Sequence, residues 1–242
     1  MRQNDIYEEG AALSIATGNS MAQEAMYDTS IMIALSIRQN TYIPAKRLFD
    51  VFAGIAGSMF LIPTAIILKI LYLLSGDRAP VIYTQERIGK NGIPFKMYKF
   101  RSMVPNAEIL LKEMLEDEKW RNQWKRKQKL DDDPRITKIG SIIRKTSIDE
   151  LPQFINVLKG DMSVIGPRPL VEGELEEHGG LKIYQSVRPG ISGWWACNGR
   201  SDTEYKERFE LEYYYIKNCS IILDIRCLFR TVSAVLSKKG AK

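Results

Sequence analysis

The hydrophobic pattern is dominated by an uncharged apolar run at residues 51–68, VFAGIAGSMFLIPTAIIL. Its 18 residues reach the usual length of a membrane-helix candidate. Pro63 lies inside the run, where it removes a backbone donor and bends a helix. The pattern therefore predicts a bent apolar helix that enters a membrane.

Basic residues flank the run on both sides: Lys46 and Arg47 precede it, and Lys69 and Arg78 follow it. Basic residues beside a membrane helix tend to stay on the cytoplasmic side. A re-entrant helix, which leaves by the face through which it entered, would place both basic ends there. From the residues alone, a spanning helix with a proline kink is an equal alternative.

The pattern then changes to two short strands, at residues 80–86 and 94–100, around a turn at residues 89–92 (GKNG). This arrangement predicts a small β-hairpin. Residues 106–130 are rich in charge and helical in pattern. The apolar stripe of this stretch comprises Leu110, Leu111, Met114 and Leu115. The predicted fold class is α-rich α+β.

A second amphipathic helix is predicted near the end of the chain, at residues 220–239. Its apolar residues recur at helical spacing: Ile221, Ile222, Ile225, Leu228, Phe229, Val232 and Leu236. Such a stripe can pack in a core, or it can lie in a membrane interface with basic residues near the headgroups. The sequence alone leaves these two interpretations equal.

Composition narrows the range of partners. Of the 242 residues, 45% are hydrophobic and 26% are charged, which is ordinary for a folded protein. The net charge of +6 favours an anionic partner: nucleic acid, a membrane surface or a phosphorylated substrate. The three cysteines show no CxxC spacing, and His178 is the only histidine. Disulfide frameworks, zinc sites and Ser-His-Asp triads are therefore disfavoured.

An acidic pair, Asp149 and Glu150, lies in the stretch KTSIDELPQF at residues 145–154. Ser147 and Glu150 have the spacing of a capping box, which predicts a helix start here. The helix dipole would then keep Asp149 ionised and attract phosphate. The apolar face predicted for this helix comprises Leu151, Phe154, Ile155 and Leu158. Local sequence alone favours a simple cap over a chemical role.

Three arginines lie in rigid or glycine-rich loops: Arg168 between two prolines, Arg188 before a proline, and Arg200 after Asn198 and a glycine. Guanidinium groups held in this way suit bidentate contact with phosphate oxygens. The sequence contains no P-loop and no GxGxxG pattern, so nucleotide-binding folds built on them are disfavoured. The acidic pair, these loops and the apolar run together indicate phosphoryl chemistry on a membrane substrate.

Several motifs occur in the order typical of one family. They are KRLFDV, YTQERIGKNGIPFKMYKFRSM, DPRITKIGSIIRKTSIDELPQFINVLKGDMSVIGPRP, VRPGISGW and NGRSD. Over about residues 44–240, the chain resembles the bacterial sugar transferase family, the monotopic polyprenyl-phosphate phosphoglycosyl transferases. It looks closest to the subgroup that transfers galactose 1-phosphate or glucose 1-phosphate in capsule and exopolysaccharide assembly.

The resemblance implies an enzyme that moves a sugar 1-phosphate from a UDP-sugar to undecaprenyl phosphate and releases UMP, with Mg²⁺. Asp149 matches the aspartate that attacks the β-phosphate to form a covalent phosphosugar-aspartyl enzyme. Asp149 and Glu150 would be the catalytic pair and the metal ligands. Lys99, Arg144 and Arg168 match family positions near the phosphates. Nucleotide or sugar contacts are assigned to Arg188, Asn198 and Arg200, for which structural roles are an equal alternative.

The resemblance also implies a monotopic protein on the cytoplasmic face of the bacterial plasma membrane. Residues 1–43 would be an extension, residues 44–74 a Pro-kinked re-entrant helix, and residues 75–242 a globular catalytic domain with interfacial amphipathic helices. Family members often have Ser-Pro at the break, whereas this chain has Ile62-Pro63. Trp195 and Cys197 also depart from the family pattern, which leaves the sugar preference open.

Partners and alternatives follow from the same features. The expected partners are a UDP-sugar, undecaprenyl phosphate and membrane lipids, with no nucleic acid, and a homodimer is left open. A catalytically silent scaffold for polysaccharide assembly is one alternative, but the intact Asp149-Glu150 pair argues against it. A basic nucleic-acid-binding protein is another, but the sequence carries no recognition motif for that role.

Overall fold

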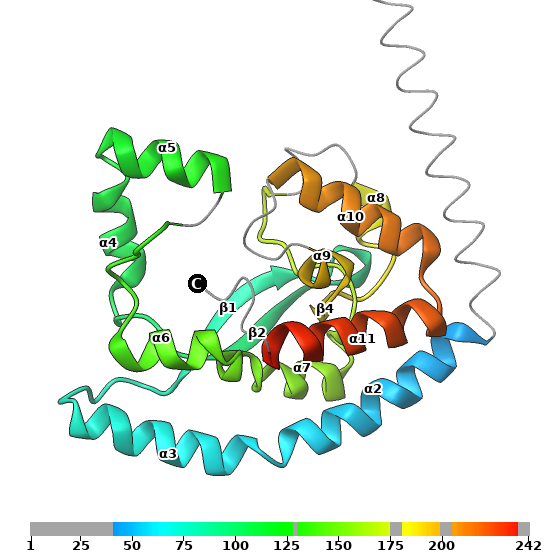
Figure 1. Ribbon diagram of the computed structural model, residues 1–242, viewed down its shortest axis with the longest axis horizontal. Coiled ribbons are helices and arrows are strands. Elements are labelled where there is room, and N and C mark those ends of the chain that lie inside the picture. The colour runs from blue at the N-terminus through cyan, green and yellow to red at the C-terminus, as the bar shows by residue number, and fades with distance from the viewer. Residues whose placement is uncertain (1–40, 128–129, 175–180, 199–204, 237–242) are drawn as a thin grey trace, which may run out of the picture.

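The computed structural model of the chain describes residues 41–127, 130–174, 181–198 and 205–236. Two helices, α2 (Tyr42–Ser58) and α3 (Leu61–Leu74), form an arc along one side of the molecule (Figure 1). The remaining elements lie on one side of this arc in the same view. The expected extension at residues 1–43 lies almost wholly outside the described residues.

The arc is broken at Met59 and Phe60, between the two helices. Pro63 occupies the first turn of α3, where a proline fits because the first amides of a helix have no partner within it. A continuous helix would need the residue at 63 to donate to the carbonyl of Met59, and proline has no N–H with which to do so. The predicted proline kink is confirmed as a helix-break-helix.

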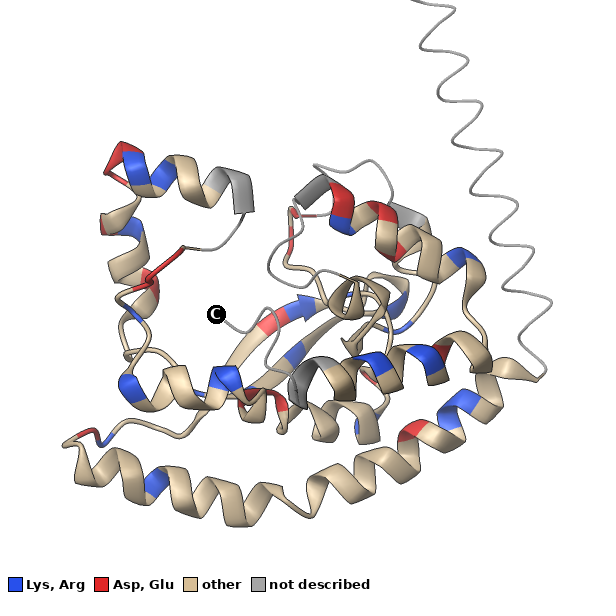
Figure 2. Ribbon diagram, in the orientation of Figure 1, with Lys and Arg blue, Asp and Glu red and all other residues tan. Residues whose placement is uncertain are grey.

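Most of the arc is uncovered by the rest of the chain. Within the described residues, Tyr42–Leu74 is the one stretch long and apolar enough to cross a membrane. Of its most apolar 18 residues, 11% are buried inside the protein. Charged side chains are sparse along it (Figure 2). The most exposed apolar side chains of the arc are Phe52, Met59, Phe60, Ile62 and Leu74, each at least 65% exposed. An apolar surface of this extent marks an interaction site rather than a core helix.

The predicted hairpin is confirmed. Strands β1 (Ile82–Ile88) and β2 (Pro94–Phe100) pair antiparallel, with Ile82 opposite Phe100 and Ile88 opposite Pro94. A short 3-10 turn, η1 (Lys90–Gly92), connects them, and its Asn91 has a φ of 59°. Asparagine tolerates this left-handed conformation better than most residues, which explains its place at the turn.

The helical stretch predicted at residues 106–130 forms two helices rather than one. These are α4 (Ala107–Met114) and α5 (Glu118–Lys127), and a turn at Leu115–Asp117 separates them. The predicted stripe is only half-buried, and no α4 residue is fully buried. Both helices lie at one end of the molecule in Figure 1, away from α8, α9 and α10.

A second, parallel pair of strands was not predicted. Strand β3 (Ser163–Ile165) pairs with β4 (Gly190–Ser192), and both lie among short helices and turns. Gly190 permits this pairing, because a Cβ there would lie 2.1 Å from the amide nitrogen of Gly166. The elements around this pair are α6 (Lys138–Lys145), η2 (Ile148–Glu150), α7 (Gln153–Lys159), α8 (Leu181–Tyr184), α9 (Trp194–Cys197), α10 (Tyr205–Asn218) and α11 (Ile221–Leu236).

The C-terminal amphipathic helix is present as α11, but most of the predicted stripe does not face the core. Leu223, Asp224 and Cys227 are the buried residues of α11 instead. The exposed members of the stripe are Ile221, Ile222, Ile225, Phe229 and Val232, at 47% to 71% exposure. Of the described stripe residues, only Leu228 packs against the core, and Leu223 and Cys227 on the other side of the helix belong to the core itself. The helix is therefore packed in the core, whereas most of its predicted stripe faces outward.

Candidate active site

The acidic pair lies in the short turn η2, between α6 and α7. Ser147 reverses the chain after α6 with a φ of 57°, and its side chain makes no capping hydrogen bond. Helix α7 begins only at Gln153, after Pro152. The predicted capping box is wrong, because Ser147 uses a left-handed backbone conformation to turn the chain and does not adopt the extended conformation of a cap.

The apolar face predicted for α7 is also partly wrong. Gln153, Asn156 and Val157 are its buried residues, whereas Ile155 is 40% exposed. Helix α7 is packed on two sides, with Phe154 and Leu158 against α2 and Asn156 against β2. A helix buried between two partners needs polar side chains where it meets exposed backbone groups, so a single apolar stripe could not describe it.

Asn156 fixes the strand that carries Lys99 to the helix that follows the acidic pair. Its Oδ1 accepts from the Tyr98 amide at 3.1 Å, and its Nδ2 donates to the Lys96 carbonyl at 2.7 Å. Nδ2 also lies 3.2 Å from Oδ2 of Asp161. A fully buried amide with these bonds holds its partners in one geometry, because leaving any of them unpaired is costly. Asp161 therefore orients the loop after α7.

The electrostatics of Asp149 differ from the sequence expectation. Burial and the neighbouring charge of Glu150 raise the pKa of Asp149 to about 6, and the opposing influence of Lys99 and Arg144 is smaller. A helix dipole was expected to keep this carboxylate ionised. The pKa is raised and not lowered, because Asp149 lies in a 3-10 turn before α7, where burial outweighs the favourable charges; the carboxylate is still ionised above pH 6.

Two predicted cations stand at the acidic pair. The ammonium of Lys99, on β2, lies 3.3 Å from Oε1 of Glu150. Arg144, in the last turn of α6, is close enough to Asp149 to lower its pKa. The Nη1 atom of Arg144 is buried and has no hydrogen-bond partner within the described part of the chain. An unpaired buried guanidinium nitrogen near a carboxylate pair is suited to an anionic ligand.

The pair also has the chemistry that Mg²⁺ requires. Mg²⁺ is usually held by one or two carboxylates, together with waters and substrate phosphates. Glu150 follows Asp149 in η2 and its charge raises the pKa of Asp149, so a cation at the pair would be attracted by both carboxylates. Across the described ranges, no group of three acidic, histidine or cysteine residues could hold a metal alone. Two carboxylates are a ligand set that waters and substrate phosphates can complete around Mg²⁺, and Mg²⁺ itself stays a prediction.

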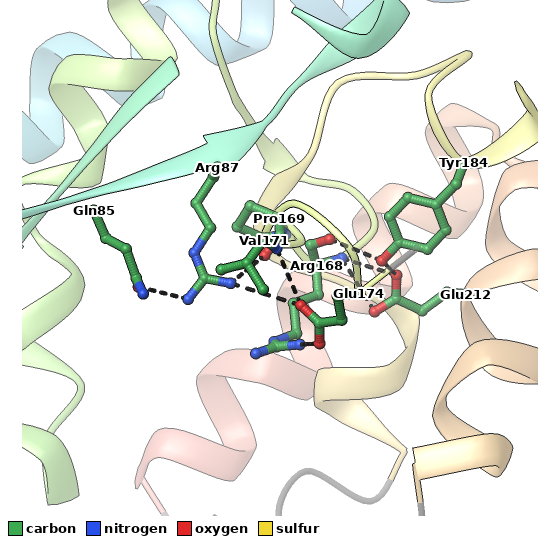
Figure 3. Close-up of polar contacts among 8 residues, drawn as sticks. All are labelled: Gln85, Arg87, Arg168, Pro169, Val171, Glu174, Tyr184 and Glu212. Carbon is green, nitrogen blue, oxygen red and sulfur yellow. Dashed lines mark hydrogen bonds and ion pairs between the residues drawn. The ribbon is translucent and has the colours of Figure 1, made fainter. Parts of the chain in front are cut away.

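Arg168 is held in a separate network (Figure 3). Its Nη1 donates to Oε1 of Glu174 at 2.6 Å, and its amide donates to both carboxylate oxygens of Glu212. The Tyr184 hydroxyl donates to Glu212 and to the Arg168 carbonyl. Burial raises the pKa of Glu212 to about 7, against the opposing influence of Tyr184 and Arg168. This network fixes the backbone of the Pro-Arg-Pro loop, and no described contact joins Arg168 to Asp149.

Sequence reasoning missed Glu174, Tyr184 and Glu212. For Glu212 a signal was present, because it lies three residues after Phe209 and four before Ile216, which are both buried. A carboxylate on the apolar face of α10 indicates a buried partner. Glu174 and Tyr184 carry no comparable local signal.

The other predicted contact residues lie elsewhere. Arg188 donates through Nε to the Gly160 carbonyl at 2.7 Å and lines a cavity whose walls do not include the acidic pair. Asn198 caps α9 through the Trp194 carbonyl and accepts from Arg230 of α11 at 2.6 Å. Arg200 lies outside the described residues. The structure therefore brings together Asp149, Glu150, Lys99 and Arg144, and leaves the nucleotide or sugar contacts of the rest as predictions.

A half-buried carboxylate pair with Lys99 and Arg144 nearby, on a chain with an exposed apolar arc, is typical of a protein that handles phosphate at a membrane. The chain belongs to the bacterial sugar transferase family, whose profile matches residues 41–238.

Relatives agree with this family. The chain is 43% identical over 198 residues to the undecaprenyl-phosphate galactose phosphotransferase of Salmonella typhimurium. The aligned region covers 81% of the chain and 41% of that protein. It is 39% identical over 199 residues to the exopolysaccharide production protein ExoY of Sinorhizobium fredii. Here the aligned region covers 81% of the chain and 88% of that protein.

A third relative carries a different sugar in its name. It is the UDP-N-acetylgalactosamine-undecaprenyl-phosphate N-acetylgalactosaminephosphotransferase of Aeromonas hydrophila, which is 37% identical over 211 residues, or 83% of this chain and 46% of that protein. The chain thus spans less than half the length of the Salmonella and Aeromonas proteins.

Proposed function

We propose that the protein transfers a sugar 1-phosphate from a UDP-sugar to undecaprenyl phosphate and releases UMP, as an early membrane step of capsule, exopolysaccharide or O-antigen assembly. The observation that carries this proposal is the acidic pair, with Asp149 half-buried beside Glu150, Lys99 bound to Glu150, and Arg144 close enough to influence Asp149. The names of the relatives support the same reaction class and the same lipid acceptor.

In the first half-reaction, a carboxylate oxygen of Asp149 attacks the β-phosphorus of the UDP-sugar. The bond between the β-phosphorus and the oxygen bridging to UMP breaks, and UMP leaves with that electron pair. A covalent phosphosugar-aspartyl enzyme results, in which Asp149 and the sugar phosphate form a mixed anhydride. In the second half-reaction, a phosphate oxygen of undecaprenyl phosphate attacks the same phosphorus and releases the Asp149 carboxylate. Covalent catalysis of this kind divides one difficult displacement into two easier steps.

The surrounding residues have distinct roles in this scheme. Asp149 must be ionised to attack, which requires a pH above its pKa of about 6. The unpaired Nη1 of Arg144 would take a phosphate oxygen, and the Lys99 ammonium orients Glu150. Mg²⁺ held by Asp149 and Glu150 would neutralise charge on the diphosphate and the departing UMP. Arg168 would approach the substrate only with the loop that Glu212 holds.

The membrane arrangement is part of the proposal. The exposed apolar arc of α2 and α3 would enter the cytoplasmic face of the plasma membrane and leave by the same face. Basic residues at both ends of the arc support this topology, and the exposed stripe of α11 would lie in the interface. Cysteines introduced at Thr41 and Ser75 should both react with an impermeant maleimide only after cells are permeabilised. Reaction of either one in intact spheroplasts would contradict the re-entrant path.

UMP release tests the reaction. Detergent-solubilised protein, Mg²⁺ and undecaprenyl phosphate would be combined with UDP-linked galactose, glucose, N-acetylgalactosamine, N-acetylglucosamine and a diacetamido sugar. We expect lipid-dependent UMP release with galactose or glucose. Without the lipid, a phosphosugar adduct should appear by mass spectrometry on the peptide that contains Asp149. No UMP release with any of these sugars, or an adduct on another residue, would contradict the proposal.

A further inference from the structure

A second site lies in a cavity of about 470 Å³ whose lining does not include Asp149 or Glu150. The start of α2, the turn between β1 and β2, and the loop before β4 form its walls. Its volume is in the range of small-molecule sites. Four cationic side chains line it, namely Lys46, Arg47, Lys90 and Arg188. The cavity is therefore a strongly basic pocket next to the apolar arc.

Two of the four cations are committed to internal partners. Lys46 forms an ion pair with Asp224 of α11 at 2.7 Å. Arg47 donates to the carbonyls of Val157 and Leu158, at 2.6 Å and 2.8 Å, and so completes the C-terminal end of α7. These two residues build the wall and hold it in place.

The other two cations lack a carboxylate partner. The side-chain ammonium of Lys90 makes no hydrogen bond or ion pair with a described residue, and only its backbone carbonyl is used, by the Ile93 amide. Among the residues that the structure describes, the Arg188 side chain bonds through Nε to the Gly160 carbonyl, and its two terminal nitrogens have no partner there. Burial and the charge of Arg188 lower the pKa of Lys90, so these two cations repel each other across the cavity. Like charges held together in a half-buried site are stabilised when an anion lies between them.

The one carboxylate in the lining does not serve that purpose. Asp50 is 1% exposed, and its Oδ1 accepts from the Ser163 hydroxyl and the Val164 amide, each at 2.9 Å. Its charge is therefore directed at β3. Ile43, Ile165 and Val187 supply an apolar part of the wall, so the cavity offers a cationic end and an apolar end.

We propose that this cavity binds the phosphate group of an organic phosphate, a monoester or a diester, between Lys90 and Arg188, at a site separate from the acidic pair. The ammonium and guanidinium groups take the phosphate oxygens, and the apolar wall takes the organic part. A soluble organic phosphate and a phospholipid headgroup both have this chemistry. The place of the cavity beside the start of α2 makes it accessible to either source.

The reactivity of Lys90 provides a direct test. The full-length protein in dodecyl maltoside, which contains no phosphate, would be acetylated with sulfo-NHS-acetate, and each lysine would be quantified by mass spectrometry. Lys96, exposed on β2 of the same hairpin, is the internal reference. Three probes would be added at matched ionic strength: inorganic phosphate, glycerol phosphate and phosphatidylglycerol in mixed micelles, with sodium chloride as the control.

A bound phosphate should slow the acetylation of Lys90, because each unit of raised pKa removes about tenfold of the reactive neutral amine. We expect protection of Lys90 but not of Lys96. Protection by glycerol phosphate at lower concentration than by the lipid identifies a soluble ligand, and the reverse order identifies a headgroup. Equal slowing of both lysines would mean simple charge screening and would overturn the proposal. So would a Lys90 that is inert before any probe is added, because the chain itself would then fill the cavity.

Three variants separate phosphate binding from a general effect of charge. Arg188→Gln should abolish the protection of Lys90, whereas Arg78→Gln, the same charge change at an exposed residue after α3, should leave it intact. Arg188→Lys keeps the charge and should retain most of the protection, which controls for a fold damaged by the loss of the Gly160 contact. Full protection in Arg188→Gln would overturn the proposal.

Discussion

At the scale of single residues, the burial of Asp149 determines both the pH at which this carboxylate can react and how much its charge destabilises the folded protein. Because its pKa in the folded protein is about 6, above the ordinary value of 3.8, the protonated form is favoured by folding. The folded state therefore loses stability as pH rises from about 4 to about 6 and the carboxylate ionises. Above pH 6, the protein holds an ionised nucleophile in a position that does not favour its charge.

Asp149→Asn should abolish transfer and stabilise the fold. In buffer without Mg²⁺ at pH 7.5, we expect a gain of about 1–3 kcal/mol in the free energy of unfolding, since roughly two pKa units correspond to this amount. The gain should disappear near pH 4. Denaturant unfolding at several pH values measures the gain, and UMP release measures the activity.

Asp77→Asn is the matched control, and we expect it to change the free energy of unfolding in the opposite direction. Burial tends to raise the pKa of Asp77, but the Ala79 amide and Arg101 lower it below its ordinary value. This variant should therefore lose stability above pH 4 while keeping transfer activity. If Asp149→Asn also loses stability at pH 7.5, the carboxylate is not in an unfavourable environment, and the raised pKa is wrong.

At the scale of elements, the contact between α2 and α7 joins the apolar arc to the acidic pair. Gly57 makes this contact close, because a Cβ at this position would lie 2.3 Å from the Phe154 ring. Gly54 has the same relation to Leu158, at 2.7 Å. The two glycines let α7 lie against the helix that we place at the membrane.

Gly57→Ala should separate the two helices and destabilise the protein by about 1–3 kcal/mol, the usual cost of overpacking. Thermal unfolding in detergent measures the loss. Phe154→Leu removes the ring that the new methyl group meets, so the double variant should recover most of the stability. A Gly57→Ala protein as stable as the wild type would show that the two helices are not in close contact.

Elements with a strong local signal were predictable, and those fixed by distant partners were not. The β-hairpin follows from its GKNG turn, and the helix break follows from Pro63, since both depend on backbone rules of a few residues. The buried face of α7 was mispredicted because β2 and α2 cover it on both sides. The β3–β4 pair was missed because three residues per strand give no readable period.

At the scale of the whole molecule, side chains from distant segments hold the loops of the site. Glu212 of α10 binds the amide of Arg168, 44 residues earlier in the chain, and Tyr184 completes the contact. The acidic pair, Lys99 and Arg144 were predictable because family motifs contain them. The burial of Glu212 could be inferred from its place on the apolar face of α10, but its partners could not, because they are defined only once α10 packs on the loop.

Glu212→Gln should lower transfer activity by about tenfold or more, since small displacements of binding groups have effects of this size. The glutamine side chain at position 212 keeps one acceptor oxygen, whereas the carboxylate of Glu212 has two. It therefore cannot accept through both atoms from the Arg168 amide and Tyr184. We expect the loss mainly in KM for the UDP-sugar if the loop binds the substrate. Glu210→Gln, an exposed change on the same helix, should leave the kinetics unchanged. Equal kinetics for both variants would exclude a positioning role for Glu212.

The ion pair between the start of α2 and α11 also has a consequence for synthesis. Tyr42 donates to Asp224 at 2.9 Å across 182 residues, and Lys46 binds the same carboxylate oxygen. A ribosome adding about 5–20 residues per second needs roughly 10–40 s to make the intervening chain. During that interval the apolar arc has emerged but its polar partner does not yet exist. The order of translation therefore favours membrane entry of the arc before the domain closes around its first turn.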